Sequence, residues 1–129
     1  MNGFCFDFSF IKSGTPIVTL SAVGMAFNAG SRSLLGNPPQ VDIGFDENAL
    51  AIAVRPPVDG SPSPEYEFEG RAKDGWVRIS MRDFMRFLSQ RSGIDFLEKA
   101  IQFIPEYDAS NNMLVIIVDE EHAKVKNRT

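Results

Sequence analysis

A chain of 129 residues is short enough for one domain and long enough to bury an apolar core of its own. Its only cysteine, Cys5, excludes an intrachain disulfide and a structural zinc site of cysteines and histidines. The net charge of -4 argues against a domain that wraps nucleic acid nonspecifically, because such domains are usually basic, so any DNA contact would come from a local basic patch.

The N-terminal residues do not have the pattern of a targeting signal. Residues 1–12 lack a basic leader and contain Asp7, and no apolar run approaches the roughly 20 residues that cross a bilayer. We therefore expect a cytoplasmic protein without membrane contact. Residues 120–129 are charged and aperiodic, which predicts a frayed tail.

The first predicted element is a strand within residues 4–11. Phenylalanine occupies every second position from Phe4 to Phe10, with Cys5, Asp7 and Ser9 between them. A period of two is typical of a strand with one buried face. Phenylalanines on an exposed face would promote aggregation, so a core or edge strand is preferred over a face that stacks ligands.

A strand and a short helix are predicted next. Residues 17–20 are rich in β-branched side chains, and Gly24 separates them from the following segment. Asn28 is expected to cap a helix over residues 29–35, which Gly36 ends in a left-handed conformation. A helix this short is stable only if its apolar residues pack.

A hairpin and a linker follow. Residues 41–45 and 50–54 alternate between apolar and small or polar side chains, which predicts two antiparallel strands. Small residues on the outer face of the return strand suggest close contact with another layer. Residues 56–64 contain too many prolines to pack and are interpreted as a linker. Tyr66 and Phe68 alternate with glutamates, which predicts an amphipathic strand or an extended arm.

The strongest helix signal follows a strand over residues 76–79. Ser80 and Asp83 resemble a capping box, and Gly93 is expected to end the helix. The apolar spacing places Met81, Phe84, Phe87 and Leu88 on the core face and Arg82, Arg86, Ser89 and Gln90 on the outer surface.

The last third of the chain is predicted to end in a central strand. Residues 94–100 leave a helical turn and an irregular connection both open. Residues 101–107 then lead through a turn at 108–112 into residues 113–118, which are apolar on both faces. A strand of that kind belongs in the middle of a sheet or barrel.

The order of these elements recurs along the chain. Residues 17–21 align with residues 76–80 at an offset of 59 (76 minus 17), and each segment is followed by a helix and a hairpin. The predicted fold is α+β, a β-barrel-like or highly twisted antiparallel sheet built from two β-α-β-β repeats with short helices. Within a single domain, repeat one spans about 14–56, the linker 56–64, repeat two about 65–119 and the tail 120–129.

Three stretches carry a resemblance to a known family: IVTLS, SRSLLGNPPQVDIGFDENALAIAVRP, and VRISMRDFMRFLSQRSG with MLVIIV. They resemble the AbrB-like or MraZ-like swapped-hairpin regulators of bacterial transcription, and this chain resembles the tandem form. In that family two units intertwine into a barrel that presents basic residues to DNA. The resemblance therefore implies a DNA-binding transcriptional regulator. The chain departs from the family at Pro39-Gln40, where a glycine-acid pair is usual, and at Thr15-Pro16, where basic residues are usual.

The arginines are the candidate residues for contact with double-stranded DNA. Arg32 and Arg91 lie 59 apart (91 minus 32), so a two-fold arrangement would display them symmetrically near the ends of the two helices. There they could meet phosphates or guanine edges. Arg78, Arg82 and Arg86 would extend this patch on the second repeat. The alternative is that all five are ordinary surface residues whose stems pack on the edge of the core.

Other chemistry is less well supported, and neither an enzyme nor a cofactor or metal is expected. Glu65, Glu67 and Glu69 could in principle hold a divalent cation, but a solvated strand face or an acidic arm over the arginines is preferred. His122 lies in the charged tail and Cys5 in the aromatic strand, so neither resembles a catalytic group. The alternative function is a non-enzymatic protein-interaction or assembly module whose acidic strand faces a protein partner. The open edge of the aromatic strand also suggests a homodimer.

Overall fold

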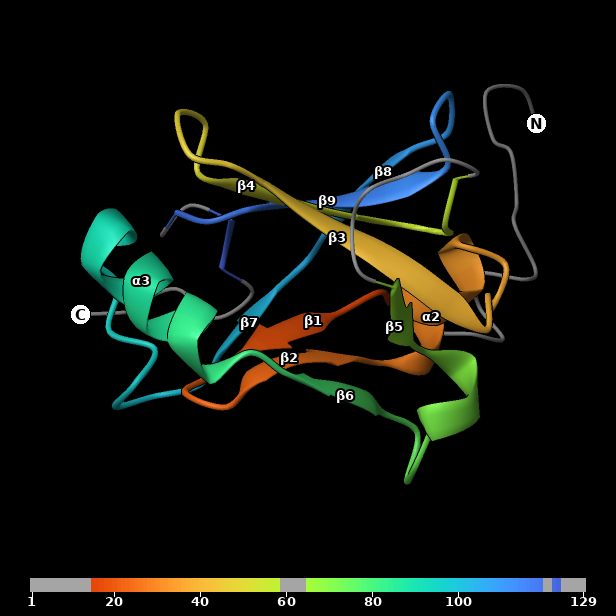
Figure 1. The fold of residues 1–129 in the computed structure, drawn as a ribbon, viewed down its shortest axis with the longest axis horizontal. Helices are drawn as coiled ribbons and strands as arrows, with labels where there is room; N and C mark the ends of the chain where they lie inside the picture. Colours follow the sequence, from red (N-terminus) through yellow and green to blue (C-terminus); the bar gives the residue numbers. More distant parts are fainter. Residues whose placement is uncertain (1–14, 59–64, 120–121, 124–129) are drawn as a thin grey trace, which may run out of the picture.

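The protein folds as two antiparallel sheets with short helices at the two ends (Figure 1). The computed structural model describes residues 15–58, 65–119 and 122–123. Sheet A, the lower sheet of Figure 1, has the strand order β6-β2-β1-β7, and sheet B, above it, has the order β5-β3-β4-β9-β8. Within these residues the sheets do not close into a barrel, so the fold is α+β as predicted but the barrel-like form is wrong.

The elements have the following bounds. Sheet A contains β1 (Val18–Leu20), β2 (Gly24–Phe27), β6 (Val77–Ser80) and β7 (Ile101–Phe103). Sheet B contains β3 (Gln40–Asp46), β4 (Ala51–Arg55), β5 (Glu65–Glu67), β8 (Glu106–Asp108) and β9 (Met113–Ile117). The helices are α2 (Ala29–Leu34), the short 3₁₀ helix η1 (Glu69–Arg71) and α3 (Arg82–Ser92).

The core fills the space between the two sheets. Alternate residues of β4 and β9 point into it, and so do alternate residues of β1 and β6. Aromatic rings close the two ends of this core, since Phe27 packs edge-on against Phe68 with centroids 5.0 Å apart, and Phe96 lies 6.2 Å from Phe103. One continuous apolar cluster therefore joins the first and second halves of the chain.

Several predicted local signals are confirmed. The Asn28 side chain accepts a hydrogen bond of 2.9 Å from the backbone of Ser31 and caps α2. Gly36 and Gly93 both have left-handed backbones, with φ of +82° and +77°, where the two α-helices end. The predicted hairpin is formed by β3 and β4, and β9 lies between β4 and β8, as its apolar faces indicated.

Two details of α3 differ from the prediction. Met81 is the N-cap residue and no side chain caps the helix, so the Ser80 capping box is wrong. The buried residues of α3 are Met85 and Leu88, whereas Phe87 is 39% exposed. The buried side of the helix is therefore rotated relative to the prediction, and Phe87 packs against Phe45 with ring centroids 6.0 Å apart.

The predicted architecture of two β-α-β-β repeats is not confirmed. The strand that leads into α2 is β2, which the alignment of residues 17–21 with 76–80 leaves out. The first half therefore has the order β-β-α-β-β, and the segment from β6 onward has the order β-α-β-β-β because β7 follows α3. Residues 94–100 form an irregular connection without a helix. The predicted strand at residues 4–11, most of the linker and most of the tail lie outside the described residues.

Candidate nucleic-acid interface

Exposed arginines gather where β6 leads into α3. Val77 and Ile79 point into the core, so the alternation of the strand turns Arg78 outward. In α3 the burial of Met85 and Leu88 leaves Arg82 and Arg86 on the opposite, exposed side. We call Arg78, Arg82 and Arg86 the β6–α3 basic surface.

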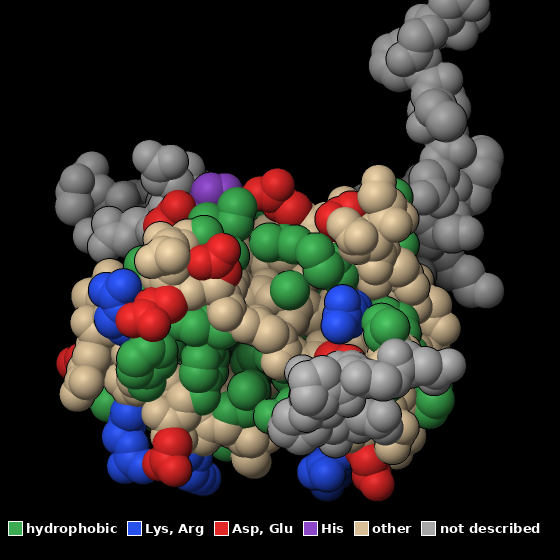
Figure 2. Space-filling model, turned by 45° about the horizontal axis from the view of Figure 1, so that its top comes forward, with side chains coloured by type: hydrophobic (Ala, Val, Ile, Leu, Met, Phe, Trp, Pro, Cys, Tyr) green, Lys and Arg blue, Asp and Glu red, His purple; other side chains and the backbone are tan. Residues whose placement is uncertain are grey.

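The charge around this surface is only partly neutralised. Arg86 forms an ion pair with Asp83, one turn earlier on the exposed side of α3. No ion pair within the described residues involves Arg78 or Arg82. In Figure 2 most Lys and Arg side chains lie along the lower edge of the molecule and most Asp and Glu side chains lie over its upper part. Acidic side chains also lie beside the basic ones along this edge, so the two charges are mixed on the face that Figure 2 shows.

The outer face of sheet A continues the basic surface with mostly polar side chains. Its central row runs from Arg78 to the facing Ala26, then to Thr19 and to Gln102, each opposite the next on the neighbouring strand. Ala26 and Thr19, in the middle of the row, have short side chains, and Arg78 and Gln102, at its ends, have long ones. No described helix crosses this face in Figure 1, so a broad ligand could approach it.

Arg32 does not belong to this surface. Its side chain is buried, with 6% of the residue exposed. The guanidinium donates hydrogen bonds to Glu69 Oε1 at 2.9 Å, to the carbonyl oxygen of Gly75 at 2.8 Å and to that of Phe27 at 3.1 Å. The predicted surface display of Arg32 is therefore wrong, because this arginine ties α2 to η1 and to the turn before β6.

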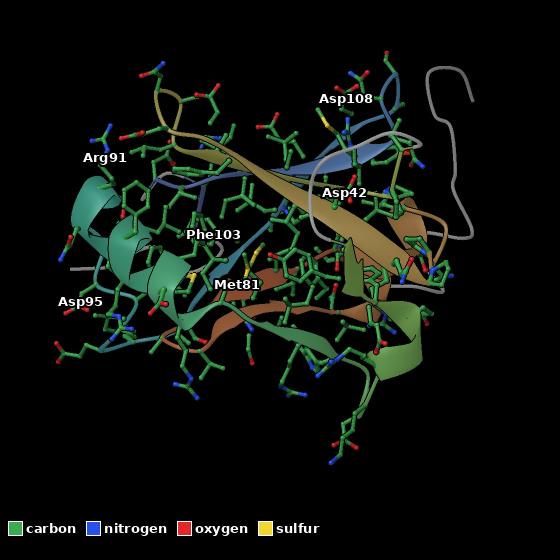
Figure 3. All side chains as sticks on the ribbon, viewed as in Figure 1. Asp42, Met81, Arg91, Asp95, Phe103 and Asp108 are labelled. Atoms are coloured by element: carbon green, nitrogen blue, oxygen red, sulfur yellow. The ribbon has the colours of Figure 1, made fainter. Side chains whose placement is uncertain are left out.

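Arg91 is exposed but lies at another end of the molecule. It stands in the last turn of α3, near the loop between β3 and β4 (Figure 3). Its Nε atom lies 3.0 Å from Glu47 Oε2 in that loop. Arg32 and Arg91 thus differ in burial and in partners, and the predicted symmetric pair is not formed.

The acidic residues do not form a metal centre. Glu69 is in η1 rather than on a strand and binds Arg32, so the predicted row of three glutamates on one strand is wrong. His122 Nδ1 lies 2.6 Å from Asp119 Oδ1, and its Nε2 lies 3.7 Å from Glu106 Oε2. Among the described residues, no group of three or more His, Cys, Asp or Glu side chains could hold a metal ion.

Two features were not predicted from the sequence. A depression of about 230 Å³ beside the end of α3 adjoins the basic surface through Arg86, and Ile94 and Leu97 form part of its wall. Asp42 in β3 is only 4% exposed, yet among the described residues neither carboxylate oxygen accepts a hydrogen bond. Arg55 Nε lies 4.0 Å from Asp42 Oδ2. Burial of an aspartate has no signature in its own sequence neighbourhood.

Comparisons with models of protein families, with curated proteins and with solved structures found no match. Among the described residues no helix is long and apolar enough to cross a membrane; α3, with 11 residues, is the longest. The interpretation of the site therefore depends on its own geometry and charge.

Proposed function

We propose that this protein is a DNA-binding transcriptional regulator that contacts the duplex through the β6–α3 basic surface and the adjoining outer face of sheet A. The observation that carries the proposal is the clustering of Arg78, Arg82 and Arg86 on two consecutive elements. Arginines placed in this way can bind phosphates at several points along a backbone, and affinity for DNA comes mainly from such contacts.

The strand arrangement supports the swapped-hairpin interpretation. The segment β2-α2-β3-β4 has a counterpart in β6-α3-β8-β9, with β7 as an insertion. β2 pairs antiparallel with β6, and β4 with β9, as two intertwined units would. In this correspondence Met25 of β2 matches Val77 of β6, at an offset of 52 (77 minus 25), and Ile52 of β4 matches Leu114 of β9, at an offset of 62 (114 minus 52). All four side chains point into the core. The second offset is larger because α3 is longer than α2 and because β7 is inserted between α3 and β8.

The proposal is tested by fluorescence anisotropy with a labelled DNA duplex at about 50 mM salt, where phosphate contacts contribute strongly. The double variant Arg78→Ala, Arg82→Ala should bind at least about tenfold more weakly, and its plot of log affinity against log salt should be shallower by about 1.8, since each lost phosphate contact removes about 0.9. Arg91→Ala is the matched control, because it removes an exposed arginine outside the β6–α3 basic surface. Absence of binding by the unmodified protein, or equal binding by the double variant, would refute the proposal.

A second candidate function is a protein-interaction module that uses β5. This strand pairs only with β3, so its other backbone edge is open within the described residues, and Glu67 is exposed on it. An extended basic peptide could add a strand at this edge. Charge reversal at Glu67 should then weaken binding of a lysine-rich extended peptide while DNA binding is unchanged. If the unmodified protein does not bind such a peptide, this candidate is excluded.

A further inference from the structure

The outer side of α3 carries an exposed apolar residue between two opposite charges. Phe87 is 39% exposed, whereas Met85 and Leu88, which hold α3 to the core, are fully buried. Asp83 lies four residues before Phe87 and Arg91 four residues after it, so the three side chains follow one row along the helix. We call Asp83, Phe87 and Arg91 the α3 stripe. Figure 1 shows α3 at one end of the molecule, with no described helix or strand on its outer side.

Phe87 is the most exposed ring of an aromatic cluster, not an isolated side chain. Its ring centroid lies 6.0 Å from that of Phe45 in β3 and 6.3 Å from that of Phe84, and Phe45 and Phe84 are 5.2 Å apart. Phe45 and Phe84 are themselves only partly buried. The three rings support one another, so Phe87 presents an ordered apolar surface, and covering such a surface favours association.

The charged residues of the α3 stripe can each bind a further partner. Asp83 pairs with Arg86 through Oδ1, and Arg91 binds Glu47 through Nε and Nη2. Within the described part of the chain, Asp83 Oδ2 and Arg91 Nη1 have no partner. The Asp83 side chain is 95% exposed and the Arg91 side chain 44% exposed. Exposed pairs of this kind contribute little on their own, so they do not prevent a second contact.

The α3 stripe is complementary to itself. When two copies of one helix pack antiparallel about a two-fold axis, residues at equal distances before and after the axis face each other. With the axis at Phe87, this residue faces Phe87 of the second copy, and Asp83 faces Arg91 of the second copy. Opposite charges then meet about 6 Å on either side of the aromatic pair, at a rise of 1.5 Å per residue. A parallel arrangement would instead place like charges against each other, which is unfavourable.

We propose that two copies of this chain associate through the α3 stripe as a two-fold symmetric dimer. The two Phe87 rings cover each other. Arg91 of each copy lies between its own Glu47 and Asp83 of the second copy, and that Asp83 keeps its contact with Arg86. The result is a row of four alternating charges on each side of the axis, and networks of charges contribute more than isolated surface pairs. A contact made by one helix is small for a protein interface, so the dimer is weak.

The proposal does not rest on DNA binding, and its test contains no DNA. Sedimentation equilibrium of the full chain at about 50 mM salt is measured from about 10 µM to about 1 mM protein. The average mass should rise with concentration toward that of a dimer. A chain that stays monomeric over this range would overturn the proposal and leave the α3 stripe to a different partner.

Charge reversal tests the antiparallel pairing. Asp83→Lys and Arg91→Glu each place like charges on both sides of the axis, so each variant alone should associate at least about tenfold more weakly. An equal mixture of the two should regain association, because the two introduced charges attract on one side and the native Asp83–Arg91 pair forms on the other. Glu98→Lys and Lys99→Glu are the matched controls: they make the same changes in charge at exposed positions outside the stripe and should associate like the unmodified protein.

The aromatic contact is tested by Phe87→Ala, with circular dichroism to verify that each variant is folded. This variant should also associate at least about tenfold more weakly, and unlike the charge reversals it should not be rescued by mixing with either of them. Association that survives Phe87→Ala would exclude the aromatic pair at the axis. A mixture of the two charge-reversal variants that stays monomeric, or charge reversals that leave association unchanged, would exclude the antiparallel pairing and with it the proposal.

Discussion

Replacement of Arg32 tests whether this arginine is a structural residue rather than a DNA contact. Arg32→Met keeps most of the length of the side chain but removes every donor. Two main-chain carbonyl oxygens, those of Phe27 and Gly75, then lose a charged donor, and the carboxylate of Glu69 loses its partner. All three acceptors belong to different parts of the fold, so the loss should destabilise the whole molecule.

The magnitude follows from burial. The buried Phe27 carbonyl that loses its charged donor accounts for about 1.5 kcal/mol, and the partly buried Gly75 carbonyl for about 1 kcal/mol. The Glu69 side chain is 36% exposed, so the ion pair itself adds only about 0.5 kcal/mol after solvent screening. Arg32→Met should therefore lower the free energy of unfolding by about 3 kcal/mol, and Glu69→Gln by less than about 1 kcal/mol.

Urea unfolding followed by circular dichroism measures both values. With a denaturant dependence of about 1.5 kcal/mol per molar, Arg32→Met should move the midpoint by about 2 M and Glu69→Gln by no more than about 0.7 M. Arg32→Lys should resemble Arg32→Met, because an ammonium cannot reach three acceptors in the plane of a guanidinium. A loss below about 1 kcal/mol for Arg32→Met, or equal losses for Arg32→Met and Glu69→Gln, would refute this account of Arg32.

Three further changes test the fold. Gly24→Ala should destabilise by about 2–4 kcal/mol in the same urea assay, because a Cβ atom there would lie 2.0 Å from a main-chain oxygen of β6; a loss under about 1 kcal/mol would contradict the close approach. A hydrogen bond from the Asn111 side chain lowers the pKa of Asp108; backbone amides also lower it, and burial opposes them. The carboxylate therefore stabilises the fold at pH values above its ordinary pKa. This contribution disappears as the pH falls through the lower pKa of the folded protein. In Asn111→Ala the pKa of Asp108 should rise toward its ordinary value, so the loss of stability should begin at higher pH. A carboxyl NMR titration measures this pKa, and an unchanged value would exclude the side-chain amide as the main cause. Phe87→Ala should destabilise by only about 1–2 kcal/mol and Leu88→Ala by about 2–5 kcal/mol, since Phe87 is 39% exposed and Leu88 is buried. A loss for Phe87→Ala as large as that for Leu88→Ala would show that both residues lie on the core face, as the sequence predicted.

Local signals in the sequence predicted the local structure well, and contacts between distant segments explain the errors. Asn28 and Gly36 delimit α2 because a cap and a left-handed residue act within a few positions along the chain. Gly24 was interpreted as a break between elements, but it begins β2. Its lack of a side chain lets β6 approach, and nothing in the neighbouring residues indicates that contact.

The same reasoning explains why the arginines were grouped wrongly. Spacing along the chain paired Arg32 with Arg91, but burial depends on partners that spacing does not reveal. The acceptors of Arg32 include Glu69, 37 residues away, and Gly75, 43 residues away. For Arg78 the alternation within β6 was sufficient to predict an exposed side chain. Val77 and Ile79, on either side of it, point into the core, so Arg78 must point outward.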